Sequence, residues 1–145
     1  MNNPSLAVRL MTMTSLFKLF SQSCGLSIKE AQMFLGTNVD TTKSWWAGRR
    51  NPPEAVLEKL VDLSITQDVA AQELLLELEK LDKKNKKQHL TLQAYGLDSQ
   101  AQSAGWPSAN AYMAVIRKAV EKMPAELAMR LVLVTDSNKN IPAPE

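Results

Sequence analysis

The residues with the clearest chemical potential lie between positions 25 and 53, where cations and small polar side chains follow two short helical patterns. Arg49 and Arg50 carry guanidinium groups that bind phosphate oxygens, and Asn51 follows them directly. The stretch 39–44 holds small polar and charged side chains that match the hydrogen-bonding edges of base pairs. These residue types in this order point to nucleic-acid binding.

Groups that could carry out catalysis are scarce, because the chain contains one His and one Cys. Catalysis needs an acid, a base or a nucleophile converging on one site, and the sequence contains no GxSxG, HExxH or P-loop motif. A single Cys also excludes an intrachain disulfide and a zinc site built from several cysteines. We therefore expect a protein that is not an enzyme and that uses no cofactor and no metal.

The formal charge of the 145-residue chain is +2, from 17 Lys and Arg against 15 Asp and Glu, which argues against a generic polybasic protein. The positive charge is nevertheless concentrated. The stretch from Arg9 to Arg50 has six cations and two anions, whereas the residues after position 64 balance. A second, local cluster spans Lys83–Lys87. We interpret it as a solvated linker, with a second phosphate contact or an RNA contact as the alternative.

Helix signals surround the basic stretch. The predicted helices of this part span residues 13–24, 27–35, 39–46 and 53–63. Ser27 and Glu30 form a capping-box pattern that opens the second helix, and Gly36 ends it. Asn38 can cap the third, which stops at Gly48. Two short helices joined by a three-residue turn that contains Gly constitute a helix-turn-helix.

This stretch resembles the λ-repressor/Cro-like (XRE-type) helix-turn-helix family. The resemblance is carried by Gly25-Leu26-Ser27, Glu30-Ala31, Leu35-Gly36, Trp45-x-x-Gly48 and Arg49-Arg50. It covers about 50 residues and implies a sequence-specific DNA-binding regulator, with repression as the expected action. The base contacts that it implies are Val39, Asp40, Lys43 and Ser44. The phosphate contacts that it implies are Ser27, Ile28, Lys29, Arg49, Arg50 and Asn51.

Three positions depart from the family pattern. Gln32 stands where a small Ala is usual, Thr42 where Val or Ile is usual, and Trp46 where a polar residue is usual. The first two departures predict an altered packing of the two helices. Trp45 is expected in the core of this part, and Trp46 is expected to be exposed.

The second half of the chain changes its pattern. It predicts a helix over 66–83 capped by Thr66, a strand over 89–95, helices over 98–104 and 109–123, and a strand over 129–135. We expect a mainly α fold: a λ-repressor-like helix-turn-helix bundle over 1–65, a linking helix and basic linker over 66–87, and a small strand–helix–strand (α+β) part over 88–145. The element order is similar to that of small YdiL-like and anti-CRISPR-associated regulators, whose tails mediate dimerisation.

The expected active form is a homodimer on double-stranded DNA with a palindromic operator, its half-sites about one turn (~34 Å) apart. The leucines of residues 71–81 are expected in the core of the chain itself, with a dimer interface as the alternative. The candidates for dimer contacts are Leu74, Leu78, Leu81, Leu131 and Leu133. A protein-interaction or antitoxin-like module and an RNA-binding regulator remain the alternatives. No apolar run reaches the roughly 20 residues of a membrane span, and the first residues lack a signal-peptide pattern. We therefore expect a cytoplasmic protein without membrane contact.

Overall fold

The computed structural model describes residues 15–136. Its helices are α2 (Leu16–Ser23), α3 (Ile28–Leu35), α4 (Val39–Trp46), α5 (Glu54–Lys84), α6 (Asp98–Ser103), α7 (Ala109–Glu121) and α8 (Ala125–Met129), and its strands are β1 (Leu90–Tyr95) and β2 (Leu131–Asp136). This architecture confirms the mainly helical fold class with a small β part. Arg9, the predicted helix start at residue 13 and the residues after Asp136 lie outside the described part of the chain.

The long helix α5 is the main difference from the prediction. It runs unbroken for 31 residues and replaces the two helices predicted over 53–63 and 66–83. Thr66, predicted to cap the second of these, lies inside α5, and its hydroxyl donates to the carbonyl of Asp62 at 2.9 Å. No Gly or Pro interrupts α5. The domain boundary predicted between residues 65 and 66 therefore falls within one continuous helix.

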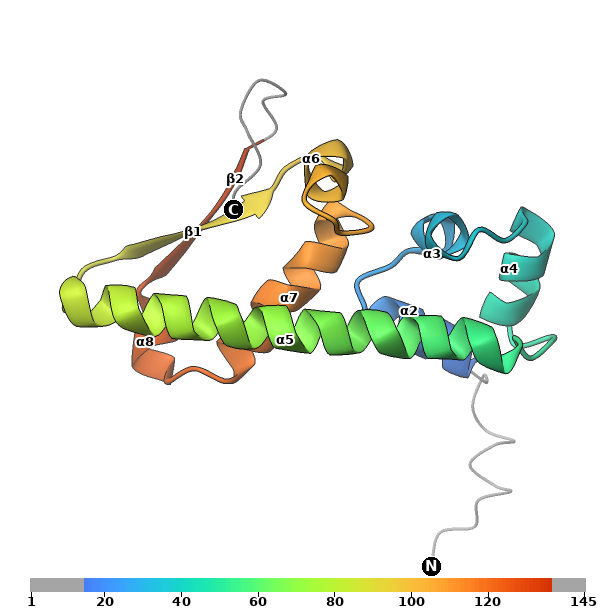
Figure 1. Ribbon diagram of the computed structural model, residues 1–145, viewed down its shortest axis with the longest axis horizontal. Coiled ribbons are helices and arrows are strands. Elements are labelled where there is room, and N and C mark those ends of the chain that lie inside the picture. Colours follow the sequence, from blue (N-terminus) through green and yellow to red (C-terminus); the bar gives the residue numbers. More distant parts are fainter. Residues whose placement is uncertain (1–14, 137–145) are drawn as a thin grey trace, which may run out of the picture.

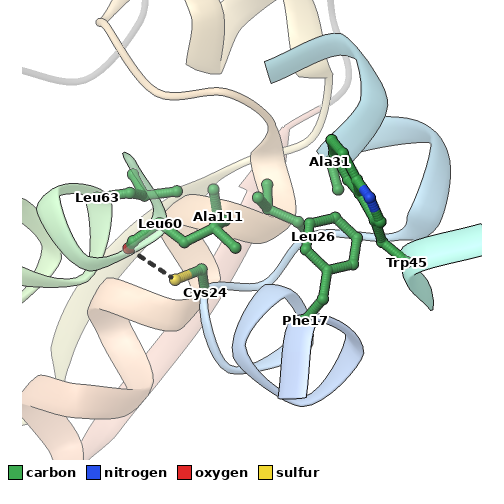
Figure 2. Packing of buried hydrophobic residues seen from close by; sticks show 8 residues of the cluster. All are labelled: Phe17, Cys24, Leu26, Ala31, Trp45, Leu60, Leu63 and Ala111. Carbon is green, nitrogen blue, oxygen red and sulfur yellow. Dashed lines mark hydrogen bonds between the residues drawn. The ribbon is translucent and has the colours of Figure 1, made fainter. Parts of the chain in front are cut away.

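Helices α2, α3 and α4 pack at the N-terminal end of α5, and the sheet lies at its other end (Figure 1). The core beneath the three short helices is drawn in Figure 2 and consists of Phe17, Cys24, Leu26, Ala31, Trp45, Leu60, Leu63 and Ala111. Ala111 belongs to α7, so the second half of the chain contributes to the core of the first. Cys24 is 1% exposed and fills this core as a small buried residue.

A second core joins α5, α7 and the sheet. Its buried members are Leu75, Leu78, Leu90, Leu92, Ala94, Ile116, Met123 and Leu127. Leu78 is 3% exposed, which agrees with the expected core position of this stripe and not with the alternative of a dimer contact, because the chain's own sheet and α7 cover it. Leu74 and Leu131 are half-buried against the same core. Leu81 and Leu133 remain exposed at 42% and 47%.

The two strands pair in parallel, with Leu90 opposite Leu131 and Tyr95 opposite Asp136. A parallel pair needs a long crossover, and α6, α7 and α8 supply it. The short helix α8 was not predicted. It begins directly after Pro124 and shifts the start of β2 from the predicted residue 129 to Leu131.

Helix α7 approaches the turn between α2 and α3 very closely. Gly25 has a φ of +78°, and a Cβ atom at this residue would lie 2.3 Å from the carbonyl oxygen of Asn110. The side-chain amide of Asn110 in turn donates to the Gly25 carbonyl at 2.9 Å. Gly25 follows the C-cap of α2 and leaves the space that the first turn of α7 occupies.

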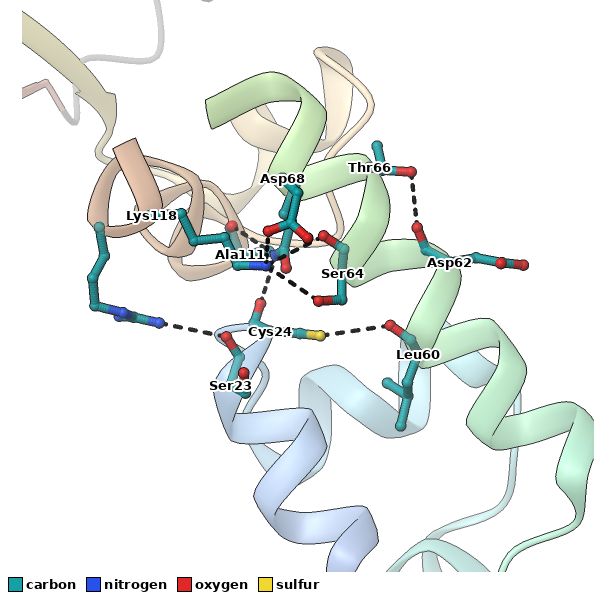
Figure 3. A network of polar contacts seen from close by, with 11 residues as sticks. Ser23, Cys24, Leu60, Asp62, Ser64, Thr66, Asp68, Ala111 and Lys118 are labelled. Atoms are coloured by element: carbon teal, nitrogen blue, oxygen red, sulfur yellow. Dashed lines mark hydrogen bonds and ion pairs between the residues drawn. The ribbon is translucent and has the colours of Figure 1, made fainter. Parts of the chain in front are cut away.

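A buried side chain from α5 completes this junction. Gln67 is fully buried, and its Nε2 donates to the carbonyls of Cys24 at 2.8 Å and Ala111 at 3.0 Å. Burying a polar group is costly unless it is hydrogen-bonded. Lys118 of α7 adds an ion pair to Asp68 at 2.7 Å and donates to the Ser64 carbonyl and hydroxyl (Figure 3). The two halves of the chain are thus connected by specific polar contacts as well as by apolar ones.

Substituting Gly25→Ala is expected to lower the free energy of unfolding by about 3 kcal/mol, because a left-handed residue and an overpacked contact add their costs. Gly36→Ala is the matched control: Gly36 has a similar φ of +69°, but nothing lies within 4 Å of the point where its Cβ atom would stand. We expect the control to cost about 1 kcal/mol. Urea denaturation measures both. Equal losses would show that the contact with α7 has no energetic weight.

Candidate nucleic-acid interface

Helix α3 is held at both ends by its own local sequence. The Ser27 hydroxyl accepts from the Glu30 N–H at 3.1 Å, and the Glu30 carboxylate accepts from the Ser27 N–H at 3.0 Å. This is the predicted capping box. At the other end, Gly36 adopts the left-handed conformation and ends the helix. The two ends fix the short turn that leads into α4.

Helix α4 begins at the predicted cap, since the Asn38 side chain accepts from the Thr41 N–H at 2.8 Å. Thr42, one of the departures from the family pattern, lies on the inner side of α4 and is 1% exposed. Its hydroxyl donates to the Asn38 carbonyl at 2.8 Å and lies 2.7 Å from that of Thr37. A polar residue is therefore accommodated here because both of its hydrogen-bonding roles are satisfied.

The two tryptophans are the last residues of α4 and pack this helix against α2. Trp45 is 6% exposed and packs edge-on against Phe17, with the ring centroids 5.5 Å apart. This burial confirms its predicted core position. Trp46 is half-buried, and its ring centroid lies 6.2 Å from that of Phe17. The prediction of an exposed Trp46 is therefore wrong, because α2 covers part of its ring.

The opposite side of α4 faces solvent. Val39 is 45% exposed, and Asp40 and Lys43 are also exposed. Ser44 differs: it is 8% exposed, and its hydroxyl accepts from Arg50 Nε at 3.2 Å. This burial and this hydrogen bond argue against Ser44 as a base contact, since its side chain turns towards the protein and orients Arg50.

The residues predicted to bind phosphate surround this exposed face in sequence. Ser27, Lys29, Arg49, Arg50 and Asn51 are exposed, and Ile28 is half-buried. The N–H groups in the first turn of a helix have no backbone acceptor within that helix. The Ser27 hydroxyl accepts from the Glu30 N–H, so those of Ile28 and Lys29 are the ones suited to an anion. Within residues 15–136 the ion pairs are Lys118–Asp68 and Arg130–Asp82. The cations next to α4 are therefore not neutralised by a carboxylate of the described chain.

Two supporting contacts were missed by sequence reasoning. Lys59 of α5 donates to the Phe34 carbonyl at 3.2 Å and lies 5.3 Å from the Phe34 ring centroid, so it holds the C-terminal end of α3. The Ser44–Arg50 hydrogen bond is the other. Neither has a sequence signal, because each depends on which side chains the folded chain brings together.

Glu30 also connects α3 to α7. Burial alone would raise the pKa of its carboxyl group, but side-chain hydrogen bonds with Ser108 and Ser27 and the Ser27 N–H lower this pKa below the ordinary value. Ser108 is fully buried and caps α7 through the Ala111 N–H at 3.0 Å. The charged form of Glu30 therefore stabilises two helix starts together.

No protein-family model and no curated protein matches this chain. Among the residues that the structure describes, no three His, Cys, Asp or Glu side chains are grouped to hold a metal ion. None of the described helices is long and apolar enough to cross a membrane.

The lowered pKa of Glu30 predicts that its contribution to the stability of the protein depends on pH. Because its folded-state pKa is lowered, its contribution to stability is fully present above the unfolded-state pKa and is lost as the pH falls through the folded-state value. The difference in unfolding free energy between the wild type and Glu30→Gln should be constant near neutral pH and shrink in acid. Chemical denaturation at a series of pH values measures it. Glu73→Gln, at an exposed carboxyl of α5, controls for charge, and a parallel pH trend there would contradict the assignment.

Proposed function

We propose that the protein is a cytoplasmic, sequence-specific DNA-binding regulator that acts as a homodimer, with α4 as its recognition helix and repression as its action. The observation that carries the proposal is the exposed face of α4, bordered by cations that have no carboxylate partner within residues 15–136. An α-helix with its side chains is about 10–12 Å across, which fits the ~12 Å width of a major groove.

The side chains of α4 suggest separate roles. Val39 can contact a thymine methyl group, Asp40 can accept from cytosine N4, and Lys43 can donate to a guanine edge or to a phosphate. These three are the base-reading residues of the proposal, without Ser44.

Phosphate binding would come from both sides of the exposed face. Arg49, Arg50 and Asn51 would bind one strand of the backbone, and Ser27, the Ile28 N–H and Lys29 the other. The modest net charge of +2 supports this division of labour. Non-specific attraction is weak at such a charge, so base contacts must supply much of the affinity.

The small size of one helix-turn-helix supports a homodimer. A single short helix contacts few base pairs, whereas two copies on half-sites separated by a whole number of helical turns combine their affinities. A palindromic sequence recovered by selection from random duplexes would support this form.

Replacing both arginines, Arg49→Ala/Arg50→Ala, should weaken binding to the selected duplex and reduce the slope of log affinity against log salt by about 1.8. The control Lys83→Ala/Lys84→Ala removes two exposed cations at the far end of α5 and should change neither quantity. Fluorescence anisotropy over a salt series measures both variants. An unchanged slope in the arginine variant, or tighter binding to hairpin RNA than to duplex DNA, would count against the proposal.

Asp40 tests base reading separately from affinity. Asp40→Ala should lower the free-energy preference for one base pair over the others by about 1–3 kcal/mol. The substitution removes the carboxylate that would accept a hydrogen bond from that base. Ser44→Ala should leave base preference unchanged, since the Ser44 hydroxyl is bonded to Arg50. Duplex selection with each variant shows the preferred sequences. A changed preference with Ser44→Ala and none with Asp40→Ala would reverse the assigned roles.

A further inference from the structure

Strand β2 exposes apolar side chains on both of its faces. Val132, Leu133 and Val134 are 44%, 47% and 40% exposed, although consecutive residues of a strand point to opposite sides. In contrast, Leu90, Leu92, Ala94 and Tyr95 of its partner β1 are buried. Parallel sheets are normally covered on both faces. β2 is thus an apolar strand left uncovered by the described chain.

The main chain of β2 also has an unused edge. The Leu90 N–H donates to the Arg130 carbonyl at 3.0 Å, and Leu90 pairs with Leu131. Since backbone groups alternate along a strand, Val132 and Val134 direct their N–H and C=O groups towards β1. Leu131, Leu133 and Thr135 therefore direct theirs to the open side of the sheet.

This edge lacks the usual protection against another strand. Edge strands commonly carry Lys, Pro or a bulge that discourages pairing, whereas residues 131–135 include no charged residue and no Pro. An isolated two-stranded sheet is marginal. In this chain β1 is the strand that packs against α5 and α7, and the outer edge of β2 pairs with no strand of the described chain. The edge is therefore suited to receive a strand of an apolar, uncharged partner.

We propose that β2 pairs antiparallel with β2 of a second copy, so that Leu133 lies opposite the Leu133 of that copy. This register makes β2 complementary to itself. Val132 then lies opposite Val134, Leu131 lies opposite Thr135, no like charges meet within 131–135, and about six main-chain hydrogen bonds form. The result is a four-stranded sheet with a two-fold axis. The choice of a second copy rests on the proposed function, because a palindromic operator requires a two-fold dimer.

The size of the strand predicts a weak dimer in solution. Six residues extend about 20 Å, and a strip roughly 10 Å wide offers on the order of 200 Å². A standard stable interface buries about 800 Å² per partner. We therefore expect association at high protein concentration or on DNA, and a covalent trap is the appropriate test.

Single cysteines test the register. Leu133→Cys should form a disulfide-linked dimer under mild oxidation, since directly opposed residues are about 5.5 Å apart between Cα atoms. Val134→Cys replaces a similarly exposed residue (40% against 47%) but lies opposite residue 132, so it should form little dimer. Buried Cys24 should not react in either variant. Non-reducing gels at high protein concentration measure the linked fraction. Equal cross-linking of the two variants, or none with Leu133→Cys, would overturn the register.

A proline substitution tests dimer formation independently of the folding of the monomer. Leu133→Pro removes an N–H that points to the open edge and not to β1, so the monomer should keep its structure by circular dichroism while the sedimenting dimer is lost. Val69→Lys is the matched control, because Val69 is an exposed apolar residue of α5 (54%) that lies outside the sheet. Dimer loss with Val69→Lys and not with Leu133→Pro would assign the interface to α5.

These outcomes are independent of DNA binding. If Leu133→Cys cross-links but the wild type binds no selected duplex, the sheet interface holds and the proposed function fails. If the wild type binds one half-site but Leu133→Cys does not cross-link, the interface is overturned and DNA binding stands.

Discussion

The contact between Gly25 and the first turn of α7 is the constraint on which the arrangement of the chain depends. A side chain at position 25 would collide with the Asn110 carbonyl, so the close fit exists because Gly25 has none. Gln67 then spans the same junction through the Cys24 and Ala111 carbonyls. Ala111 can join the first core only through this approach. The helices around α4 are therefore held by a segment that lies more than 80 residues further along the chain.

The exposed face of α4 is a consequence of what lies behind it. Trp45 and Thr42 are buried on the inner side of α4, and the Ser44 hydroxyl turns inward and accepts from Arg50. Because the inward positions take these side chains, Asp40 and Lys43 are left for solvent. The packed side and the candidate DNA-binding side thus belong to the same eight-residue helix. The polar Thr42 fits on the packed side because its hydroxyl is hydrogen-bonded.

The elements that could be predicted are those whose signals are local. The Ser27–Glu30 capping box, the Asn38 cap and the left-handed Gly36 depend on neighbouring residues, and the structure contains each as expected. The continuous α5 could not be derived from a capping pattern at Thr66, because packing along its whole length overrides that local signal. Within the candidate site, the sequence predicted base contacts for both Asp40 and Ser44, although Asp40 is exposed and Ser44 is buried. Tertiary contacts alone separate them.

In the proposed complex, the length of α5 would have a consequence for the geometry of the DNA. The helix is about 46 Å long, and α4 and the sheet lie at opposite ends of the molecule (Figure 1). In a dimer joined at β2, the two recognition helices would be at the outer ends, with uncontacted base pairs between them. Torsional phasing of that intervening duplex would then matter, because half a turn of added DNA moves one half-site to the opposite face. The stiffness of base pairs that no side chain touches would contribute to selectivity.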